Sequence, residues 1–285
     1  MKDRVGIIIV DYHNETDTLA CLDSLAQVTD RQDRRIYVVQ PDTQPNSVSQ
    51  HPLKPMVITA HENRGFAWAN NIGITQALED GCEYLVLLNN DTTVKADFLD
   101  PLIEALKGPE VGLVSPKIYF YPGREFHHDE YQESERGKVI WYAGGIIDWQ
   151  NVYAYHWGVD EVDHGQFTHA VETDFVTGCC LGITKETVNN IGMMDKRYFL
   201  YYEDADWSVR AKRKGLKVIF EPKSIIWHKN AGSTGGSGST LQQHYQARNR
   251  IRFAIKYAGV RTKLAVIRES IKNDNTKRSH NYQKC

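Results

Sequence analysis

The stretch LVLLNND at residues 85–91 is the strongest indication of the fold in this sequence. Residues 84–88 form a continuous apolar run, typical of a strand buried on both faces, and the run ends abruptly in two asparagines and an aspartate. Ligands of open α/β sheets bind beyond the carboxyl ends of the strands. Asp91 could hold a hard cation there, and the amides of Asn89 and Asn90 could bind sugar hydroxyls. An Asx turn that caps the next helix is the structural alternative.

Strand and helix patterns alternate on both sides of this segment. Apolar β-branched runs predict strands at 5–10, 36–39 and 56–59, and helical apolar stripes predict helices at 16–27, 66–78 and 98–106. This alternation predicts an α/β fold with a doubly wound, mostly parallel sheet flanked by helices.

The second half of the chain has a different pattern. A polar stretch at 121–138 predicts a surface excursion, and strands are expected at 171–176, 180–184 and 217–220. A helix is expected at 203–214. The stretch GSTGGSGST at 232–240 predicts a flexible loop that could act as a lid, followed by a basic helix at 241–258.

Composition excludes several protein classes. With 285 residues, 41% hydrophobic and 25% charged, the chain has a globular composition, and its net charge of −2 gives no general nucleic-acid signature. Its five cysteines contain no C-x-x-C pair, which argues against a disulfide framework or a thiolate zinc site. No 18-residue apolar run occurs, so no transmembrane helix is expected, and a reducing, cytoplasmic setting is the simplest interpretation.

The overall charge hides a basic tail. Residues 244–285 hold eleven Lys and Arg residues against one Glu and one Asp, a net charge of +9. Such a tail favours a peripheral contact with an anionic membrane at its inner face, and a solvated helical face is the alternative.

The segment YYEDADWSVRAKRKG, residues 201–215, carries three carboxylates at a helix start. Helix capping explains acidic residues there, but the aromatic run before them would desolvate a carboxylate and make it a better general base. Asp204 is the predicted base and Glu203 its nearest competitor. Asp206 should point away from Asp204, because two residues turn a helix by about 200°. Arg210 could pair with a carboxylate at the helix start.

Two further segments could bind phosphate. His228 precedes the glycine-rich loop, where either a structural role or a metal or diphosphate role is open. In ENRGFAWANNIGI, residues 62–74, Gly65 precedes a helix and could let the backbone approach a phosphate. The chain has no G-x-G-x-x-G, no P-loop and no G-x-S-x-G motif, which argues against dinucleotide-binding, P-loop and hydrolase classes.

The ordered set of these motifs resembles family-2 glycosyltransferases of the GT-A fold, especially their bacterial rhamnosyltransferase-like branch. The motifs lie within residues 5–255 and are VGIIIVDYHN, ENRGFAWANNIGI, LLNNDT, DFVTGCCLGITKETVNNIGMMDKRYFLYYEDADWSVRAKRKG, WHKNAGST and YQARNR. The resemblance implies a GT-A domain at 1–240, with a nucleotide-binding half at 1–115 and an acceptor-side half at 116–240. A C-terminal basic helical region would follow at 241–285.

The resemblance also implies an inverting, metal-dependent hexosyltransferase. Asn89, Asn90 and Asp91 stand where the family has its D-x-D motif, so Asp91 and His228 would hold Mg²⁺ or Mn²⁺, and Glu203 and Asp204 would supply the catalytic base. The expected donor-binding residues are Asp11, Asn14, Gln40, Asp42, Asn63, Arg64, Asn71, Asn89, Asn90, Asp91, Lys229 and Arg248. One departure is Gln40, which replaces an aspartate that reads the nucleobase in this family, with Asp42 two residues on.

The resemblance favours a dTDP-rhamnose donor, then a UDP-sugar, and a lipid-linked or surface-glycan acceptor in cell-envelope polysaccharide biosynthesis. Two rival classes predict different sequence features. A sugar nucleotidyltransferase should carry a glycine-rich basic loop after the first strand, where this chain has DYHNETDT. A non-catalytic nucleotide-sugar-binding protein would be favoured by loss of the Glu203–Asp204 pair, which is present.

Overall fold

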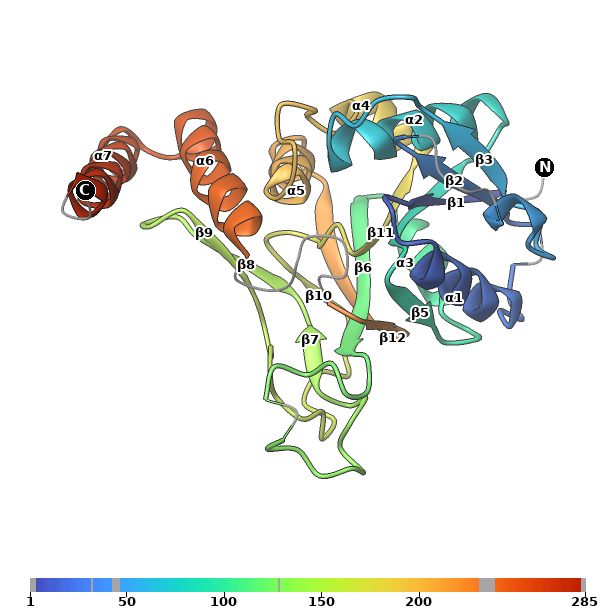
Figure 1. Ribbon diagram of the computed structural model, residues 1–285. Coiled ribbons are helices and arrows are strands. Elements are labelled where there is room, and N and C mark those ends of the chain that lie inside the picture. The colour runs from blue at the N-terminus through green and yellow to red at the C-terminus, as the bar shows by residue number, and fades with distance from the viewer. Residues whose placement is uncertain (1–3, 32, 43–46, 128, 231–238, 283–285) are drawn as a thin grey trace.

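The computed structural model describes residues 4–31, 33–42, 47–127, 129–230 and 239–282, with side chains described up to Ile271. A ten-stranded sheet runs through it in the order β10-β12-β6-β11-β4-β1-β2-β3, with β5 on β12 and β7 on β6 (Figure 1). Its strands are β1 (Val5–Val10), β2 (Arg35–Gln40), β3 (Met56–Thr59), β4 (Tyr84–Asn89), β5 (Thr92–Val94), β6 (Val111–Phe120), β7 (Ile140–Tyr142), β10 (Val171–Glu172), β11 (Cys180–Thr184) and β12 (Lys217–His228).

The pairing is mostly parallel, as the sequence predicts. Strand β1 pairs in parallel with β2 and β4, β2 with β3, and β6 with β12. Strand β11 is inserted antiparallel between β4 and β6. A separate hairpin is formed by β8 (Gly145–Asp148) and β9 (Tyr153–His156).

Helices cover both faces of the sheet. Because successive strand residues point to opposite faces, Ile7 and Ile9 pack in a cluster with α1 (Glu15–Ala26) and α3 (Leu99–Leu106), whereas Ile8 packs in a second cluster on the other face. That second cluster includes α2 (Phe66–Glu79), α4 (Lys185–Ile191) and α5 (Glu203–Arg213). The remaining helices are the short η1 (Val48–Gln50), α6 (Thr240–Tyr257) and α7 (Val260–Tyr282).

A third apolar cluster joins α6 to the rest of the protein. Phe253 and Ala254 of α6 pack with Phe175, Ala205 and Val209, so this helix lies against α5 and the β8–β9 hairpin (Figure 1). Helix α7 follows at the end of the chain. In the described part of the chain, no helix is both long and apolar enough to cross a bilayer.

Three expectations about the second half need correction or lie outside the structure. The strand expected at 171–176 is only Val171–Glu172. The strand expected at 217–220 continues to His228, with a register shift between Glu221 and Ile225; Pro222 interrupts the pairing there because it has no N–H to donate. Of the glycine-rich loop expected at 232–240, residues 232–238 lie outside the described part of the chain, and Thr240 already belongs to α6.

Candidate active site

A cleft of about 470 Å³ opens where β4 and β12 end and α5 begins. Seven of the residues predicted from the sequence line it: Asn63, Asn89, Asn90, Asp91, Glu203, Asp204 and His228. The structure therefore brings the strand-end residues and the helix-start carboxylates together in one cavity.

Sheet register brings Asp91 and His228 together. Asp91 follows β4 and precedes β5, whose antiparallel pairing places Thr92 opposite His228, the last residue of β12. Nε2 of His228 lies 3.2 Å from Oδ1 of Asp91, and both side chains are buried. The backbone N–H of Lys229 donates to the Asp91 carbonyl at 2.9 Å.

The Asp91–His228 pair fits a divalent cation that is shared with a ligand. Among the described residues, no group of three or more His, Cys, Asp or Glu side chains could hold a metal by itself. One carboxylate and one imidazole suit an ion whose remaining ligands are phosphate oxygens and water, the usual arrangement for Mg²⁺ on nucleotides.

Asp204 lies at the first turn of α5 and faces the cleft. Its Oδ2 accepts a hydrogen bond from the backbone N–H of Gly178 at 2.8 Å, and its Oδ1 accepts one from the N–H of Ala205 at 2.7 Å. Burial raises the pKa of Asp204, and these N–H donors oppose that rise because they stabilise the carboxylate.

Glu203 is buried beside it, at 4% exposure. Burial, and then the charge of Asp204, raise the pKa of Glu203 well above its ordinary value. No described group donates a hydrogen bond to its Oε2. Glu203 therefore holds its proton more firmly than Asp204 does, and Asp204 is the member of the pair that ionises more readily.

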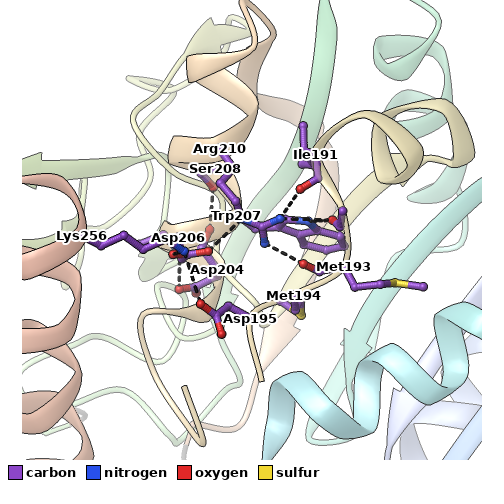
Figure 2. A network of polar contacts seen from close by, with 12 residues as sticks. Ile191, Met193, Met194, Asp195, Asp204, Asp206, Trp207, Ser208, Arg210 and Lys256 are labelled. Carbon is purple, nitrogen blue, oxygen red and sulfur yellow. Dashed lines mark hydrogen bonds and ion pairs between the residues drawn. The ribbon is translucent and has the colours of Figure 1, made fainter. Parts of the chain in front are cut away.

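Asp206 does not line the cleft, and its carboxylate lies in a network of donors (Figure 2). Its Oδ2 accepts from Arg210 Nε at 2.9 Å, and its Oδ1 accepts from Lys256 Nζ at 2.5 Å and from the Tyr257 hydroxyl at 2.7 Å. The prediction that Arg210 pairs with a helix-start carboxylate is confirmed. Since Lys256 and Tyr257 belong to α6, Asp206 links the two helices.

The other predicted donor-binding residues lie outside the cleft lining. Gln40 Nε2 donates to Asp11 Oδ2 at 3.0 Å, and both side chains are buried. Asn14 and Lys229 both donate to Asp17, at 2.6 and 2.5 Å. These four residues surround the strand ends but hold other protein groups.

Four more of the predicted donor-binding residues also lie outside the cleft lining and contact other protein groups. Asp42 pairs with His13, and Arg64 pairs with Glu62. Asn71 exchanges two hydrogen bonds with the backbone of Met194, at 2.9 and 3.1 Å, which is a structural contact between α2 and the loop after α4. The Arg248 guanidinium lies 5.8 Å from the ring centre of Tyr245.

Sequence reasoning missed an aromatic part of the cleft. Trp141 and His156 line it, and the Trp141 ring makes edge-to-face contacts at 4.5 Å with both His156 and His228. Burial lowers the pKa of His156 to about 4, so its imidazole is neutral. The glycine-broken β pattern of this region contained no signal for a site.

Helix α6 also contributes to the cleft, through Leu241, Gln242 and Gln246. The motif YQARNR lies on this helix, but of its residues only Arg248 was predicted to bind the donor. The basic pattern of α6 had indicated a tail rather than a wall of the cavity.

A model for the family described as "Glycosyltransferase like family 2" matches residues 3–253. The chain belongs to glycosyltransferase family 2. It is therefore a nucleotide-sugar glycosyltransferase with hexosyltransferase-like relatives, and the GT-A fold expected from the sequence is confirmed by solved structures.

Two curated relatives and one solved structure are similar to this chain. The "dTDP-rhamnosyl transferase RfbF" of Shigella flexneri is 23% identical over 266 residues, which cover 87% of this chain and 79% of that protein. The N-acetylglucosaminyl-diphospho-decaprenol L-rhamnosyltransferase of Mycobacterium tuberculosis is 31% identical over 74 residues, 26% of this chain and 24% of that protein. The structure of GalNAc-T7 with UDP, GalNAc and Mn²⁺ has a TM-score of 0.64 and 16% identity, covering 88% of this chain and 47% of that one.

Proposed function

We propose that the protein is an inverting, metal-dependent hexosyltransferase that transfers rhamnose or a related hexose to a lipid-linked or surface glycan. The observation that carries this proposal is the meeting of two chemically distinct sets in one cleft. Asp91 and His228 form a pair suited to a metal–diphosphate group, and Asp204 is a desolvated carboxylate suited to proton abstraction.

In the proposed reaction Asp204 takes the proton from the acceptor hydroxyl as the acceptor oxygen bonds to the anomeric carbon of the donor sugar. The bond from that carbon to the diphosphate oxygen breaks at the same time, and the electron pair leaves with the nucleoside diphosphate. A divalent ion at Asp91 and His228 would neutralise charge on that leaving group. The N–H groups of Gly178 and Ala205 orient the carboxylate of Asp204, and neutral Glu203 adds no second charge.

The Shigella relative is a dTDP-rhamnosyl transferase by name, which supports dTDP-rhamnose as donor, and the mycobacterial relative is an L-rhamnosyltransferase by name, which supports rhamnose as the sugar. A UDP-sugar is the next candidate. Of the proposed donor-binding residues, Asn63, Asn89, Asn90 and Asp91 already line the cleft. The others would have to exchange their present partners for the nucleotide. They are Asp11, Asn14, Gln40, Asp42, Arg64, Asn71, Lys229 and Arg248.

Exposed apolar and basic groups support a lipid-linked acceptor near a membrane surface. At the cleft, Tyr155, Val159 and Leu241 are 49%, 41% and 46% exposed. On α7, the exposed Arg261 and Arg268 lie close in sequence to exposed Leu264. The mycobacterial relative is named for a diphospho-decaprenol acceptor. An acceptor of that kind would contact the exposed apolar residues at the cleft, while the basic residues of α7 would contact the membrane surface.

The test is a panel of nucleotide sugars incubated with the full-length protein, Mn²⁺ and a polyprenyl-diphosphate-linked sugar acceptor. We expect release of dTDP from dTDP-rhamnose to exceed release of UDP from UDP-sugars and to require both metal and acceptor. Metal-dependent thermal stabilisation by nucleotide sugars without any turnover would instead support a binding protein. Formation of nucleotide sugar from nucleoside triphosphate and sugar phosphate would support a nucleotidyltransferase.

A further inference from the structure

The turn that precedes Glu203 and Asp204 has an unfavourable backbone. Tyr201 and Tyr202 have φ angles of 69° and 73°, in the left-handed region that non-glycine residues rarely adopt. Two consecutive residues in this region persist only where surrounding contacts impose the conformation. The turn sets where α5 begins, and therefore where the carboxylate of Asp204 lies.

Three consecutive carbonyl groups of this turn are held by other parts of the chain. The N–H of Phe66, at the start of α2, donates to the Phe199 carbonyl at 2.8 Å. The side-chain amide of Asn249 donates to the carbonyls of Leu200 at 2.7 Å and of Tyr201 at 3.0 Å. One asparagine on α6 thus satisfies two carbonyl groups of the left-handed turn.

Asn249 is completely buried, and its second amide atom, Oδ1, has no hydrogen-bond partner among the described residues. Leaving a buried acceptor unpaired is unfavourable, so the two N–H···O=C bonds explain why a polar side chain occupies this position. An apolar residue of similar size would leave the two carbonyl groups without these donors.

Other residues on the same face of α6 contact residues 197–206, which include this turn. Tyr245, one turn before Asn249, stacks on Phe199 with ring centres 4.8 Å apart. Arg252 donates to the Arg197 carbonyl at 2.6 Å, and Lys256 reaches Asp206 at 2.5 Å. These positions recur at intervals of three and four residues, so they share one helical face. Figure 2 shows the Lys256 end of this contact.

We infer that Asn249 is a positioning residue, which holds the Tyr201–Tyr202 turn in its left-handed conformation so that Asp204 faces the acceptor. Asn249 does not line the cleft and acts through the turn. On this proposal, helix α6 helps to position the catalytic base Asp204. The inference rests on the proposed function for its kinetic consequence, but its structural consequence can be measured without substrate.

The first measurement is hydrogen–deuterium exchange of peptides that cover residues 199–206 in Asn249→Ala and in a matched control, Arg250→Ala. Arg250 is the next residue on α6 and also donates two hydrogen bonds to one backbone carbonyl, that of Asn151. We expect exchange in this segment to rise at least tenfold in Asn249→Ala and to stay at the wild-type rate in Arg250→Ala. Equal exchange in both variants would overturn the inference.

The second measurement separates kcat from donor binding. We expect Asn249→Ala to lower kcat by about tenfold to a hundredfold, as misplacement of a catalytic group does, while Mn²⁺-dependent binding of the nucleoside diphosphate changes less than twofold. A purely structural residue would lower the folded fraction and leave the kcat of the folded enzyme unchanged. That result in folded protein would contradict the inference.

If Asn249→Ala does not fold, Asn249→Ser takes its place, because its small polar side chain admits water to the two carbonyl groups. Wild-type exchange and wild-type kcat in folded Asn249→Ser would overturn the inference. If the wild-type protein transfers no sugar, the proposed function fails, and the exchange comparison still decides whether Asn249 holds the turn.

Discussion

Two regions of one cleft are assembled in different ways. The strand-end region, Asp91 and His228, is formed by the pairing of β5 with β12, so main-chain hydrogen bonds of the sheet fix it. The helix-end region, Tyr201–Asp204, is fixed by donors from three separate segments, Phe66, Gly178 and Asn249. The first should tolerate side-chain changes in its surroundings, whereas the second should depend on contacts remote in sequence.

The regions also differ in electrostatics. Asp91 has the imidazole of His228 beside it, which suits a site that accepts a cation and phosphate together. The described donors to the carboxylate of Asp204 are backbone N–H groups, and desolvation outweighs them and raises its pKa. The strand-end region is therefore suited to binding the donor, and the helix-end region to moving a proton.

The largest expected effect separates these two tasks. Asp204→Asn keeps the size of the side chain and removes the base, so kcat should fall by about 10²–10⁴-fold while donor affinity changes little. Steady-state kinetics and nucleotide titration of the same preparation measure both. Glu203→Gln is the control, because a neutral Glu203 loses no charge on this change. Near wild-type turnover of Asp204→Asn together with loss in Glu203→Gln would transfer the role of base to Glu203.

A smaller effect tests whether the helix-end region depends on α6. Asp206→Ala leaves Arg210 and Lys256 without their shared carboxylate, so the free energy of unfolding should fall by about 3 kcal/mol. Asp17→Ala removes a carboxylate shared by Asn14 and Lys229 at the strand ends. Because Asp17 is 19% exposed whereas Asp206 is fully buried, this loss should be smaller, about 1 kcal/mol. Urea denaturation compares them. Equal losses would remove the distinction between the regions.

The exposed arginines of α7, in the last part of the basic tail, should affect neither region. Replacing Arg261 and Arg268 by alanine should weaken binding to anionic vesicles by about 2 kcal/mol, or about thirtyfold, and leave kcat with a soluble acceptor unchanged. The control removes the same charge from the surface excursion, in Arg124→Ala with Arg136→Ala. Sedimentation with vesicles that contain phosphatidylglycerol, at low and high salt, measures the binding. No binding at low salt by the wild type would leave the tail as a solvated helix face.

A further prediction concerns the protonation of Glu203. Its raised pKa means that the folded protein keeps a proton that the unfolded chain releases, so wild-type stability falls as pH rises from the unfolded pKa of Glu203 to its folded one. The slope is at most about 1.4 kcal/mol per pH unit. Glu203→Gln abolishes this term, so its stability relative to wild type should increase from pH 5 to pH 8 in thermal unfolding. A difference that does not vary with pH would contradict the neutral assignment.

The strand-end region could be predicted from the sequence because it depends on local patterns. An apolar run that ends in Asn-Asn-Asp places Asp91 at a sheet edge, and His228 was recognised by the motif around it. Even there Pro222 concealed the true length of β12.

The helix-end region could be predicted only in part. The position of Asp204 on α5 followed from helix geometry, but its N–H donor at Gly178 and the support from Asn249 arise from contacts between segments 26 and 48–49 residues apart in the chain. Asn71 shows the converse: it belongs to a recognisable motif, and the motif did not predict its two hydrogen bonds with the backbone of Met194. Sequence patterns report local structure, and they do not report which distant groups meet.

The strand-end region should bind the donor and the helix-end region should move the proton. Mn²⁺-dependent binding of dTDP by two variants tests this separation most directly. Calorimetric titration with and without Mn²⁺ should show that Asp91→Ala loses the metal-dependent part of dTDP affinity while keeping its fold. Asp204→Asn should bind dTDP with wild-type affinity and metal dependence. Unchanged metal dependence in Asp91→Ala, or its loss in Asp204→Asn, would contradict the account.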